Sequence, residues 1–433
     1  MILKINAREA AEVIGKKLSS NEAVPQSETV TIASQLSKQR GTPVFVTLGE
    51  HGLVLADGDK IANIPGIQNV GKIDPVGAGD TAVAGLAAVI GGGGDLESAA
   101  RFANLAASIT VKKLRTAGTA SRSELEEAGP FPDYIYEPEL ARDPRRARYL
   151  PETEIEIIRE RPALGVRHAI FDHDGTISTL RLGWENIMAP MMMKAILGTQ
   201  LQAVSDDVYR RVEKDVKCFI DRTTGLQTLA QMKGLISLVH EYGFVAKAEI
   251  LDEHGYKAVY NEALLKMVHA RVRKIERGEL DARDFEIKGA RALLEALRAA
   301  GAKLYLASGT DEADVRAEAK VMGYAHFFDG GIHGAVGDLK VEAKQVVLNR
   351  IFSSVDGPGE GVLVIGDGPV EMREGNRRGA LCLGVASNEI CRYGLDETKR
   401  TRVIRAGADY VVPDFSQLER LKPLLGIGRP FPK

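Results

Sequence analysis

The sequence predicts an α/β protein with a parallel sheet in its second half. Short apolar runs bounded by Gly or Asp, typical of buried strands, alternate along the chain with segments of helical spacing. The 433 residues are enough for two or three domains with substantial cores. Alternation of this kind favours parallel strands covered by helices on both faces, with functional sites at the carboxyl ends of the strands.

Composition limits the classes of partner and compartment. The formal net charge of −2 gives no general attraction to nucleic acid or to a membrane surface, and the basic run at 142–148 lies in a Pro-containing stretch typical of a solvated linker. Cys218, Cys382 and Cys391 are too few and too widely spaced for a disulfide framework or a zinc site. The N-terminus lacks the apolar core of a signal peptide, and no apolar run approaches about 18 residues. These features predict a cytoplasmic protein that binds neither nucleic acid nor membrane.

Residues 1–120 are expected to form the first domain. The apolar runs at 42–49 and 52–58 predict strands, and helical spacing at 79–90 and 96–114 predicts helices. From 121 to 163 the sequence is rich in Pro and charge and shows little periodicity, so this segment is expected to be a linker.

A second α/β pattern, in residues 164–433, predicts the second domain. Its strands are expected at 167–172, 302–309 and 361–368, each of the last two after a segment of helical spacing. Strand signals are scarce from about 180 to 285, where helical ones are common, so this block is expected to be a helical insertion.

Each apolar strand of the second domain ends in chemically useful side chains. The first ends at Asp172 and Asp174, the second at Ser308, and the third at Asp367 with Glu371 shortly after it. Two carboxylates buried so close together need a cation, a shared proton or a chemical use. Because parallel strand ends converge, these oxygen ligands predict a Mg²⁺ site, and Lys344 is expected to bring a positive charge to it. Such a site can hold a phosphoryl group and neutralise it during transfer.

This arrangement resembles the haloacid dehalogenase superfamily of phosphatases. The likeness covers about 165–415 and rests on four motifs in order, "DHDGT", the Ser of "ASGT", a lysine and "GDGPVE". It implies a parallel, Rossmann-like α/β core with an inserted helical cap. Asp172 would be the nucleophile that forms an aspartyl-phosphate, and Asp174 would protonate the leaving oxygen and then activate water. Ser308 and the Gly309 amide would hold phosphate oxygens.

The resemblance also implies the remaining site residues. Lys344 would offset negative charge, and its spacing to Asp367 favours it over Lys340, which stays open. Asp172, the Asp174 carbonyl and Asp367 would hold the metal. Glu371 stands where an aspartate is more usual in the family, and it is the fourth expected metal ligand.

Helices inserted between the first two motifs resemble the cap that members of this family close over the site. Polar residues at a helix start in 221–234 are candidates for reading the leaving group, namely Arg222, Thr224 and Gln227. An ordinary helix N-cap at Thr223 or Thr224 is the alternative. The substrate class is a small phosphorylated metabolite, such as a sugar phosphate or a phosphoglycolate-like acid.

The first domain carries a Gly-rich turn, in which Gly77 and Gly79 precede Asp80 at a helix start. Glycines let backbone amides converge on an anion, and the carboxylate can take a proton from an attacking hydroxyl. This turn resembles the signature of the ribokinase, or PfkB, family of sugar kinases, whose aspartate is the base. The resemblance implies Mg²⁺, phosphate and ATP contacts from further residues, which are Asn6, Glu9, Thr47, Gly49, Gly52 and Asn104.

Family members carry a long N-terminal half before the element that resembles Asn6 and Glu9, whereas here Met1 almost directly precedes it. The segment is therefore expected to lack independent sugar kinase activity. It could be completed by a second chain, be a truncated product, or be a structural relic in which Asp80 only caps a helix.

The leading functional hypothesis is a Mg²⁺-dependent phosphomonoester hydrolase fused to an incomplete, ribokinase-like α/β domain. The alternatives are a carbohydrate kinase or bifunctional kinase–phosphatase that uses ATP, and a non-catalytic protein that senses phosphate.

Overall fold

The computed structural model describes residues 2–17, 24–69, 73–116, 118–129, 132–223, 228–336, 343–355 and 359–429. The side chains of Glu185, Asp221, Arg222, Ala230 and Ala343 lie outside this description. The chain divides into two compact units, Met1–Pro138 and Glu139–Lys433, which are treated separately below.

The first unit is a small α/β domain around a four-stranded sheet in the order β1-β2-β3-β4. Only the β1–β2 pair is parallel. The strands of this unit are β1 (Leu3–Asn6), β2 (Val44–Thr47), β3 (Leu53–Asp57), β4 (Lys60–Ile64) and the short pair β5 (Gly66–Ile67) and β6 (Tyr134–Ile135). The helices are α1 (Ala7–Val13), α2 (Gln26–Arg40), α3 (Ala78–Gly91), α4 (Leu96–Thr110) and α5 (Arg122–Ala128).

Alternation along β2 explains why helices cover both faces of this sheet. Val44 and Val46 pack with buried residues of α2, whereas Phe45 points to the opposite face and packs with residues of α3 and α4. The expected strands at 42–49 and 52–58 and the helices at 79–90 and 96–114 are confirmed as β2, β3, α3 and α4.

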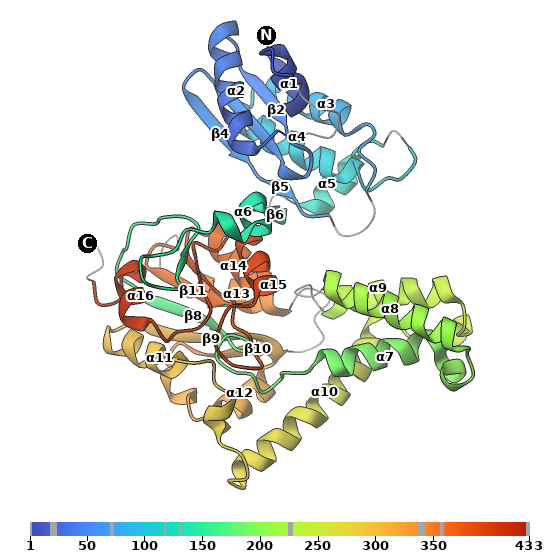
Figure 1. Ribbon diagram of the computed structural model, residues 1–433, viewed down its shortest axis with the longest axis vertical. Coiled ribbons are helices and arrows are strands. Elements are labelled where there is room, and N and C mark those ends of the chain that lie inside the picture. The colour runs from blue at the N-terminus through green and yellow to red at the C-terminus, as the bar shows by residue number, and fades with distance from the viewer. Residues whose placement is uncertain are drawn as a thin grey trace. The chain divides into compact units, whose positions relative to one another are not determined.

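The second unit contains a seven-stranded sheet in the order β10-β9-β8-β11-β12-β13-β7, in which every pair is parallel except β13–β7 (Figure 1). Its strands are β7 (Glu156–Ile157), β8 (His168–Asp172), β9 (Lys303–Asp311), β10 (Gly331–Ala335), β11 (Val362–Gly366), β12 (Leu381–Val385) and β13 (Tyr410–Val412). The helices of its core are α6 (Pro138–Arg142), which starts at the unit boundary, α11 (Ala290–Ala299), α12 (Glu312–Val321), α13 (Ala343–Ser353), α14 (Pro369–Arg377), α15 (Glu397–Arg405) and α16 (Leu418–Leu425).

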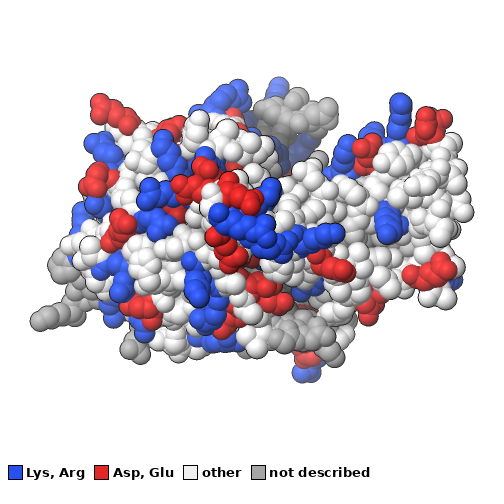
Figure 2. All heavy atoms as spheres, turned by 90° about the horizontal axis from the view of Figure 1, so that it is seen from below, with Lys and Arg blue, Asp and Glu red and all other residues white. Residues whose placement is uncertain are grey.

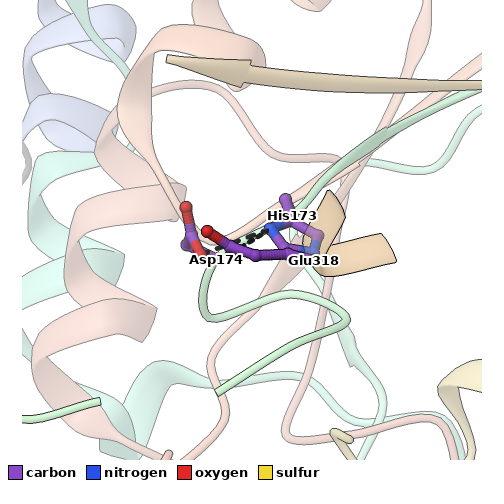
Figure 3. A group of neighbouring side chains, drawn as sticks. All are labelled: His173, Asp174 and Glu318. Carbon is purple, nitrogen blue, oxygen red and sulfur yellow. Dashed lines mark ion pairs between the residues drawn. The ribbon is translucent and has the colours of Figure 1, made fainter. Parts of the chain in front are cut away.

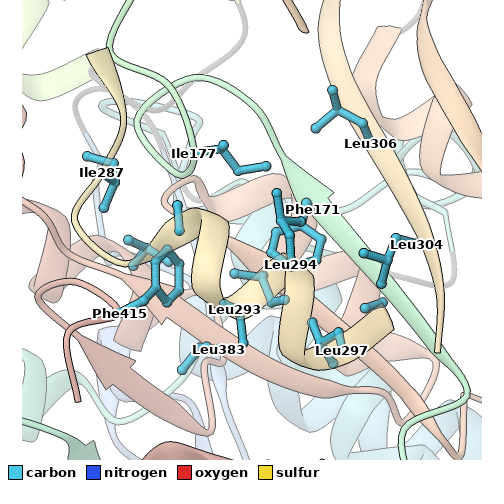
Figure 4. Close-up of a cluster of buried hydrophobic side chains, with 14 of the residues drawn as sticks. Phe171, Ile177, Ile287, Leu293, Leu294, Leu297, Leu304, Leu306, Leu383 and Phe415 are labelled. Atoms are coloured by element: carbon cyan, nitrogen blue, oxygen red, sulfur yellow. The ribbon is translucent and has the colours of Figure 1, made fainter. Parts of the chain in front are cut away.

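The central strands are buried on both faces, which is why the sequence shows them as continuous apolar runs. In β8, Ala169 and Phe171 join one hydrophobic cluster, and Ile170 points into the other. Figure 4 shows Phe171 beside the leucines of α11, Leu293, Leu294 and Leu297. The predicted α/β class is confirmed, and the expected strands at 167–172, 302–309 and 361–368 correspond to β8, β9 and β11.

The segment 121–163, expected to be a linker, contains regular structure. It includes α5, and β7 forms the antiparallel edge of the large sheet. The carboxylate of Glu156 in β7 is buried and receives two hydrogen bonds of 2.6 Å from the buried guanidinium of Arg400. This ion pair holds β7 against α15, although the sequence of 121–163 shows little periodicity.

The insertion between β8 and β9 is a group of helices with its own core. Its helices are α7 (Glu185–Leu197), α8 (Asp206–Thr223), α9 (Thr228–Tyr242) and α10 (Glu253–Glu276). Buried Met188, Met192 and Leu235 belong to this core, which is separate from the clusters that flank the sheet. The helices extend to one side of the sheet in Figure 1, in the position of the cap that the sequence predicted.

Surface charge and helix hydropathy fit the composition. On the face in Figure 2, basic and acidic side chains are interspersed, and neither sign dominates among the residues coloured there. Among the described residues, no helix combines the length and the apolar character that crossing a bilayer requires.

Candidate active site

The site lies where three neighbouring strands end. Strand β8 is paired with β9 on one side and β11 on the other, so the carboxyl ends of these strands meet at one edge. Asp172 ends β8, Ser308 lies near the end of β9, and Asp367 directly follows β11. All three line one cavity of about 1320 Å³.

A cluster of buried carboxylates forms the floor of the cavity. Oxygens of Asp172, Asp367 and Glu371 lie within 4.8 Å of one another. The Lys344 ammonium lies 2.7 Å from Asp172 Oδ1 and 2.8 Å from Glu371 Oε2. The structure thus places Lys344 where the sequence predicted it, whereas Lys340 lies outside the described residues.

Within this cluster, Asp172 and Glu371 share a single cation, Lys344. Burial raises the pKa of Asp172 well above its usual value, and the nearby carboxylates raise it further against the lowering effect of Lys344. Hard oxygen ligands gathered in a buried group suit a divalent cation such as Mg²⁺. The residues present therefore fit the metal that the sequence predicted.

The two other expected ligands of that metal differ in their surroundings. Asp367 pairs with Lys399 at 2.8 Å, and Arg402 lies 3.4 Å from the same oxygen. Burial opposes ionisation of Asp367, but these two cations outweigh it and lower its pKa to about 2. Both oxygens of Glu371 are already engaged, since Oε1 accepts the Gly368 N–H at 2.6 Å and Oε2 pairs with Lys344. Asp172 and Asp367 each have one oxygen outside the ion pairs of this cluster, so they are better suited than Glu371 to hold a metal.

A tight turn after β8 brings Asp174 to the cavity. Gly175 in this turn has a φ of +76°, and a Cβ atom there would lie 2.4 Å from Asp367 Oδ2. Only glycine satisfies both the backbone conformation and the close approach of the carboxylate. Asp174 itself is partly exposed and contacts Arg181 and His173. Burial opposes its ionisation, but the charges of Arg181 and His173 outweigh it and lower the pKa of Asp174.

The second strand supplies groups suited to hold phosphate oxygens. Ser308 is buried, and its Oγ accepts a hydrogen bond of 3.1 Å from the Thr310 N–H. Gly309 is exposed and lines the same cavity. Both therefore lie where the sequence placed them, beside Asp172 and Lys344.

The insertion contributes the opposite wall of the cavity. Thr224 and Gln227, which were predicted to read the substrate, lie outside the described residues, as does the side chain of Arg222. Thr228 and Leu229, directly after them, line the cavity. The alternative N-cap at Thr223 does not apply, because Thr223 ends α8 and its hydroxyl donates to the Phe219 carbonyl at 2.7 Å.

Helix α10 supplies further lining residues that sequence reasoning missed, Lys257, Tyr260 and Asn261. The sequence also gave no reason to select Lys399 and Arg402, because α15 is a run of charged residues that looks solvated. Lys399 and Arg402 lie three residues apart and therefore on one face of α15, and this spacing was the feature of the sequence that could have indicated a shared role.

In the first unit, the residues expected to contact Mg²⁺ cap a helix. The Asn6 side chain accepts the Glu9 N–H, and the Glu9 carboxylate accepts the Asn6 N–H, each at 2.8 Å. This reciprocal pair is a capping box at the start of α1. Asn104, expected near adenine, donates to the Pro65 carbonyl at 2.8 Å.

The other candidate nucleotide-binding residues of the first unit lie around the start of α3 and the end of β2. Gly77, with a φ of +82°, is the N-cap of α3, and Asp80 is exposed in the first turn of that helix. A Cβ atom at Gly79 would lie 3.1 Å from the Lys4 ammonium. Thr47, Gly49 and Gly52 follow one another at the end of β2, and Gly52 has no room for a side chain beside Ile64.

Carboxylates at the ends of parallel strands, with an inserted helical cap, are typical of an enzyme of parallel α/β fold with its site at the strand ends. Residues 166–377 match the family model of the haloacid dehalogenase-like hydrolases, and residues 1–122 match that of the pfkB family carbohydrate kinases. The chain therefore carries a haloacid dehalogenase-like hydrolase domain and a pfkB-family segment.

Curated relatives include two proteins named bifunctional protein HldE. That of Halorhodospira halophila is 34% identical over 154 residues, which are 34% of this chain and 31% of the relative. That of Pseudomonas syringae is 39% identical over 124 residues, which are 27% of this chain and 26% of the relative. The chain thus spans about a third or less of the length of these relatives.

Similar solved structures exist for both units. A haloacid dehalogenase-like hydrolase of Streptococcus pneumoniae is 19% identical and has a TM-score of 0.38, over 59% of this chain and 97% of its own. A ribokinase of Thermotoga maritima is 23% identical and has a TM-score of 0.25, over 29% of this chain and 41% of its own.

Proposed function

We propose that the second unit is a Mg²⁺-dependent phosphomonoesterase that acts through an aspartyl-phosphate on Asp172. The observation that supports this most strongly is the convergence of Asp172, Ser308 and Lys344 in one cavity, at the ends of adjacent strands. Asp172 and Asp367 would hold the metal, which would neutralise charge on the transferred phosphoryl group.

In the first step, an Asp172 oxygen forms a bond to phosphorus while the bond from phosphorus to the ester oxygen breaks. Asp174 gives its proton to the leaving alcohol oxygen, and the negative charge of bound phosphate beside Asp174 favours the protonated form that this step needs. Ser308 and the Gly309 amide hold phosphate oxygens, and Lys344 offsets their charge.

In the second step, water attacks phosphorus and gives a proton to Asp174. The bond between phosphorus and Asp172 breaks, which releases inorganic phosphate and regenerates both aspartates. The lowered pKa of Asp174 in the free protein means that the group is ionised there, as a base must be.

For the substrate, we propose a small phosphate ester whose leaving group carries an anionic group such as a carboxylate. Lys257 and Asn261 lie one helical turn apart on α10 and line the cavity, and neither has a hydrogen-bond or ion-pair partner within the described part of the chain. The lining residues of the described insertion include no acid, whereas Asp311 and Asp396 line the cavity from the core. The Lys257 ammonium would form an ion pair with the anionic group of such a leaving group.

The test is hydrolysis of phosphate esters by Asp172→Asn. This change keeps the shape of the side chain but removes the charge that attacks phosphorus, so kcat should fall by about 10⁴-fold or more with the fold intact. Asp311→Asn, a change at a cavity-lining aspartate outside the proposed machinery, should keep most of the activity. Near-normal turnover by Asp172→Asn would refute the mechanism.

For the first unit, we propose nucleotide binding at the start of α3, with ATP as the ligand. The match to the pfkB family model supports this, together with the left-handed Gly77 and the exposed Asp80 at that helix start. Completion of this unit by a second chain stays a prediction. Binding of ATP to the purified chain, with and without sugars, is the corresponding measurement.

A further inference from the structure

A buried polar group surrounds Asp174, and the mechanism above assigns no role to its other members. Figure 3 shows His173, Asp174 and Glu318 with their side chains turned toward one another. His173 Nδ1 lies 3.3 Å from Asp174 Oδ1 and 3.7 Å from Glu318 Oε2. His173 and Glu318 are almost completely buried, so this group belongs to the packed interior of the second unit.

Arg181 already occupies the place that a metal ion would take among these side chains. Its Nη2 donates to Glu318 Oε1 at 2.6 Å, and its Nε lies 3.4 Å from both Glu318 Oε2 and Asp174 Oδ1. A guanidinium beside two carboxylates balances most of their charge and opposes binding of a second cation. The cluster is therefore an ion-pair network.

The segment that carries Arg181 is held on both sides. Arg271, in helix α10, donates to the Leu180 carbonyl at 2.5 Å and to the Leu182 carbonyl at 2.8 Å. Glu318 belongs to α12, which begins directly after the strand that carries Ser308. The Arg181 guanidinium is thus held in two ways. Arg271 anchors the backbone on either side of Arg181, and Glu318 in α12 binds the guanidinium itself.

This network acts on one oxygen of Asp174. Oδ1 is buried against Arg181 and His173, which leaves Oδ2 as the oxygen available to the cavity that Asp174 lines. An acid–base group works only if its reactive oxygen lies within hydrogen-bond reach of the proton that it moves.

We infer that Arg181, held by Glu318, is a positioning residue that keeps Asp174 turned with Oδ2 toward the leaving oxygen. This inference rests on the proposed function. Arg181 lines the cavity, but its guanidinium is paired with Glu318 and Asp174, so it would act through Asp174. Its loss should therefore affect the steps in which Asp174 moves a proton and spare the binding of substrate.

The test compares two phosphate esters that differ in their need for a proton. p-Nitrophenyl phosphate has a leaving group that departs without protonation, whereas an alkyl phosphate needs an acid. The comparison is made on the first step, followed as release of the alcohol or of p-nitrophenolate before steady state, because the second step needs Asp174 for both esters. In this first step Arg181→Met should lower the rate on the alkyl phosphate by about 100-fold and on p-nitrophenyl phosphate by less than about 5-fold, while the Kd of each ester changes by less than about 3-fold. Arg181→Lys should restore part of the difference, and Glu318→Gln should show the same selectivity to a smaller degree.

A matched control removes an arginine from α12, the helix that carries Glu318. Arg316 forms an exposed ion pair with Glu312 at 2.8 Å on the same helix as Glu318, and Arg316→Met should change neither substrate. Thermal melting of each variant identifies loss of fold. If Arg181→Met does not fold, the decision falls to Glu318→Gln and Arg181→Lys.

The outcomes separate the two proposals. Equal losses on both esters in the first step of the folded variants, or no loss on either, would overturn the positioning role while the hydrolase proposal stands. An unmodified protein that hydrolyses neither ester in the presence of Mg²⁺ would refute the proposed function, and this inference with it.

Discussion

Replacing Gly175 with Ala tests whether the turn after β8 is shaped around the acidic cluster. The change has two costs. A non-glycine residue at a φ of +76° is strained by about 1–2 kcal/mol. The added Cβ would also lie 2.4 Å from Asp367 Oδ2, where ordinary contact begins at 3.4 Å, so this oxygen or the turn must move by about 1 Å.

Gly301→Ala is the matched control, because Gly301 has a φ of +82° and no atom within 4 Å of a new Cβ. It carries the backbone strain alone and should lower Tm by only a few °C. Gly175→Ala should lower Tm by more and also reduce kcat/KM by about 100-fold, because a misplacement of about 1 Å in a catalytic group has effects of this size. Thermal melts and assays with saturating Mg²⁺ measure both. Equal activity of the two variants would refute the reasoning.

Three further predictions concern the substrate, the metal and the first unit. Lys257→Met should raise KM for carboxylate-bearing phosphate esters by about 10-fold and leave KM for neutral alkyl phosphates unchanged. Lys266→Met, at an exposed position of the same helix, should change neither KM. Equal KM effects on both ester classes would contradict the assignment of Lys257. The pKa of Asp172 is higher in the folded protein than in the unfolded chain, so ionisation of this group as pH rises lowers the free energy of unfolding of the metal-free protein. As pH falls, protons compete with Mg²⁺ for the same carboxylate. At a fixed Mg²⁺ concentration, the rise in Tm should therefore be larger near pH 8 than near pH 5.5, and a pH-independent rise would contradict this account. Where Mg²⁺ reaches 100 times its Kd, it should add about 2.7 kcal/mol to the free energy of unfolding. Asp80→Asn should leave phosphate ester hydrolysis intact, since Asp80 belongs to the first unit; sugar-dependent ADP formation that this variant abolishes would make the kinase the primary activity.

The sequence was sufficient to predict the central strands and the residues at their ends. β8, β9 and β11 are buried on both faces, so their apolar runs are long and clear. The remaining strands of the large sheet were not predicted. β7 has two residues and β13 has three, and β10 is an edge strand with two glycines among its five residues, so none of these three gives a strong pattern. β12 is different, because its five residues form a short apolar run that is nearly all buried, and this run was overlooked.

The missed site residues are those whose role depends on distant partners. Lys399 and Glu318 lie in helices with many charged residues, and only the fold shows that they are buried beside Asp367 and Arg181. Asn6 and Glu9 illustrate the opposite difficulty. The spacing that resembles a Mg²⁺-organising element is also the spacing of a capping box, and local hydrogen bonding alone explains it.

The central claim is that phosphoryl transfer passes through Asp172, and trapping the intermediate tests it most directly. The purified chain would be mixed with a ³²P-labelled phosphate ester and Mg²⁺, quenched in acid within the first turnovers, reduced with borohydride and mapped by mass spectrometry. Borohydride converts an aspartyl-phosphate to homoserine, so the account predicts acid-stable label on the protein before reduction and homoserine at position 172 after it, with neither in Asp172→Asn. Steady release of phosphate with no labelled protein, or label at any residue other than Asp172, would contradict it.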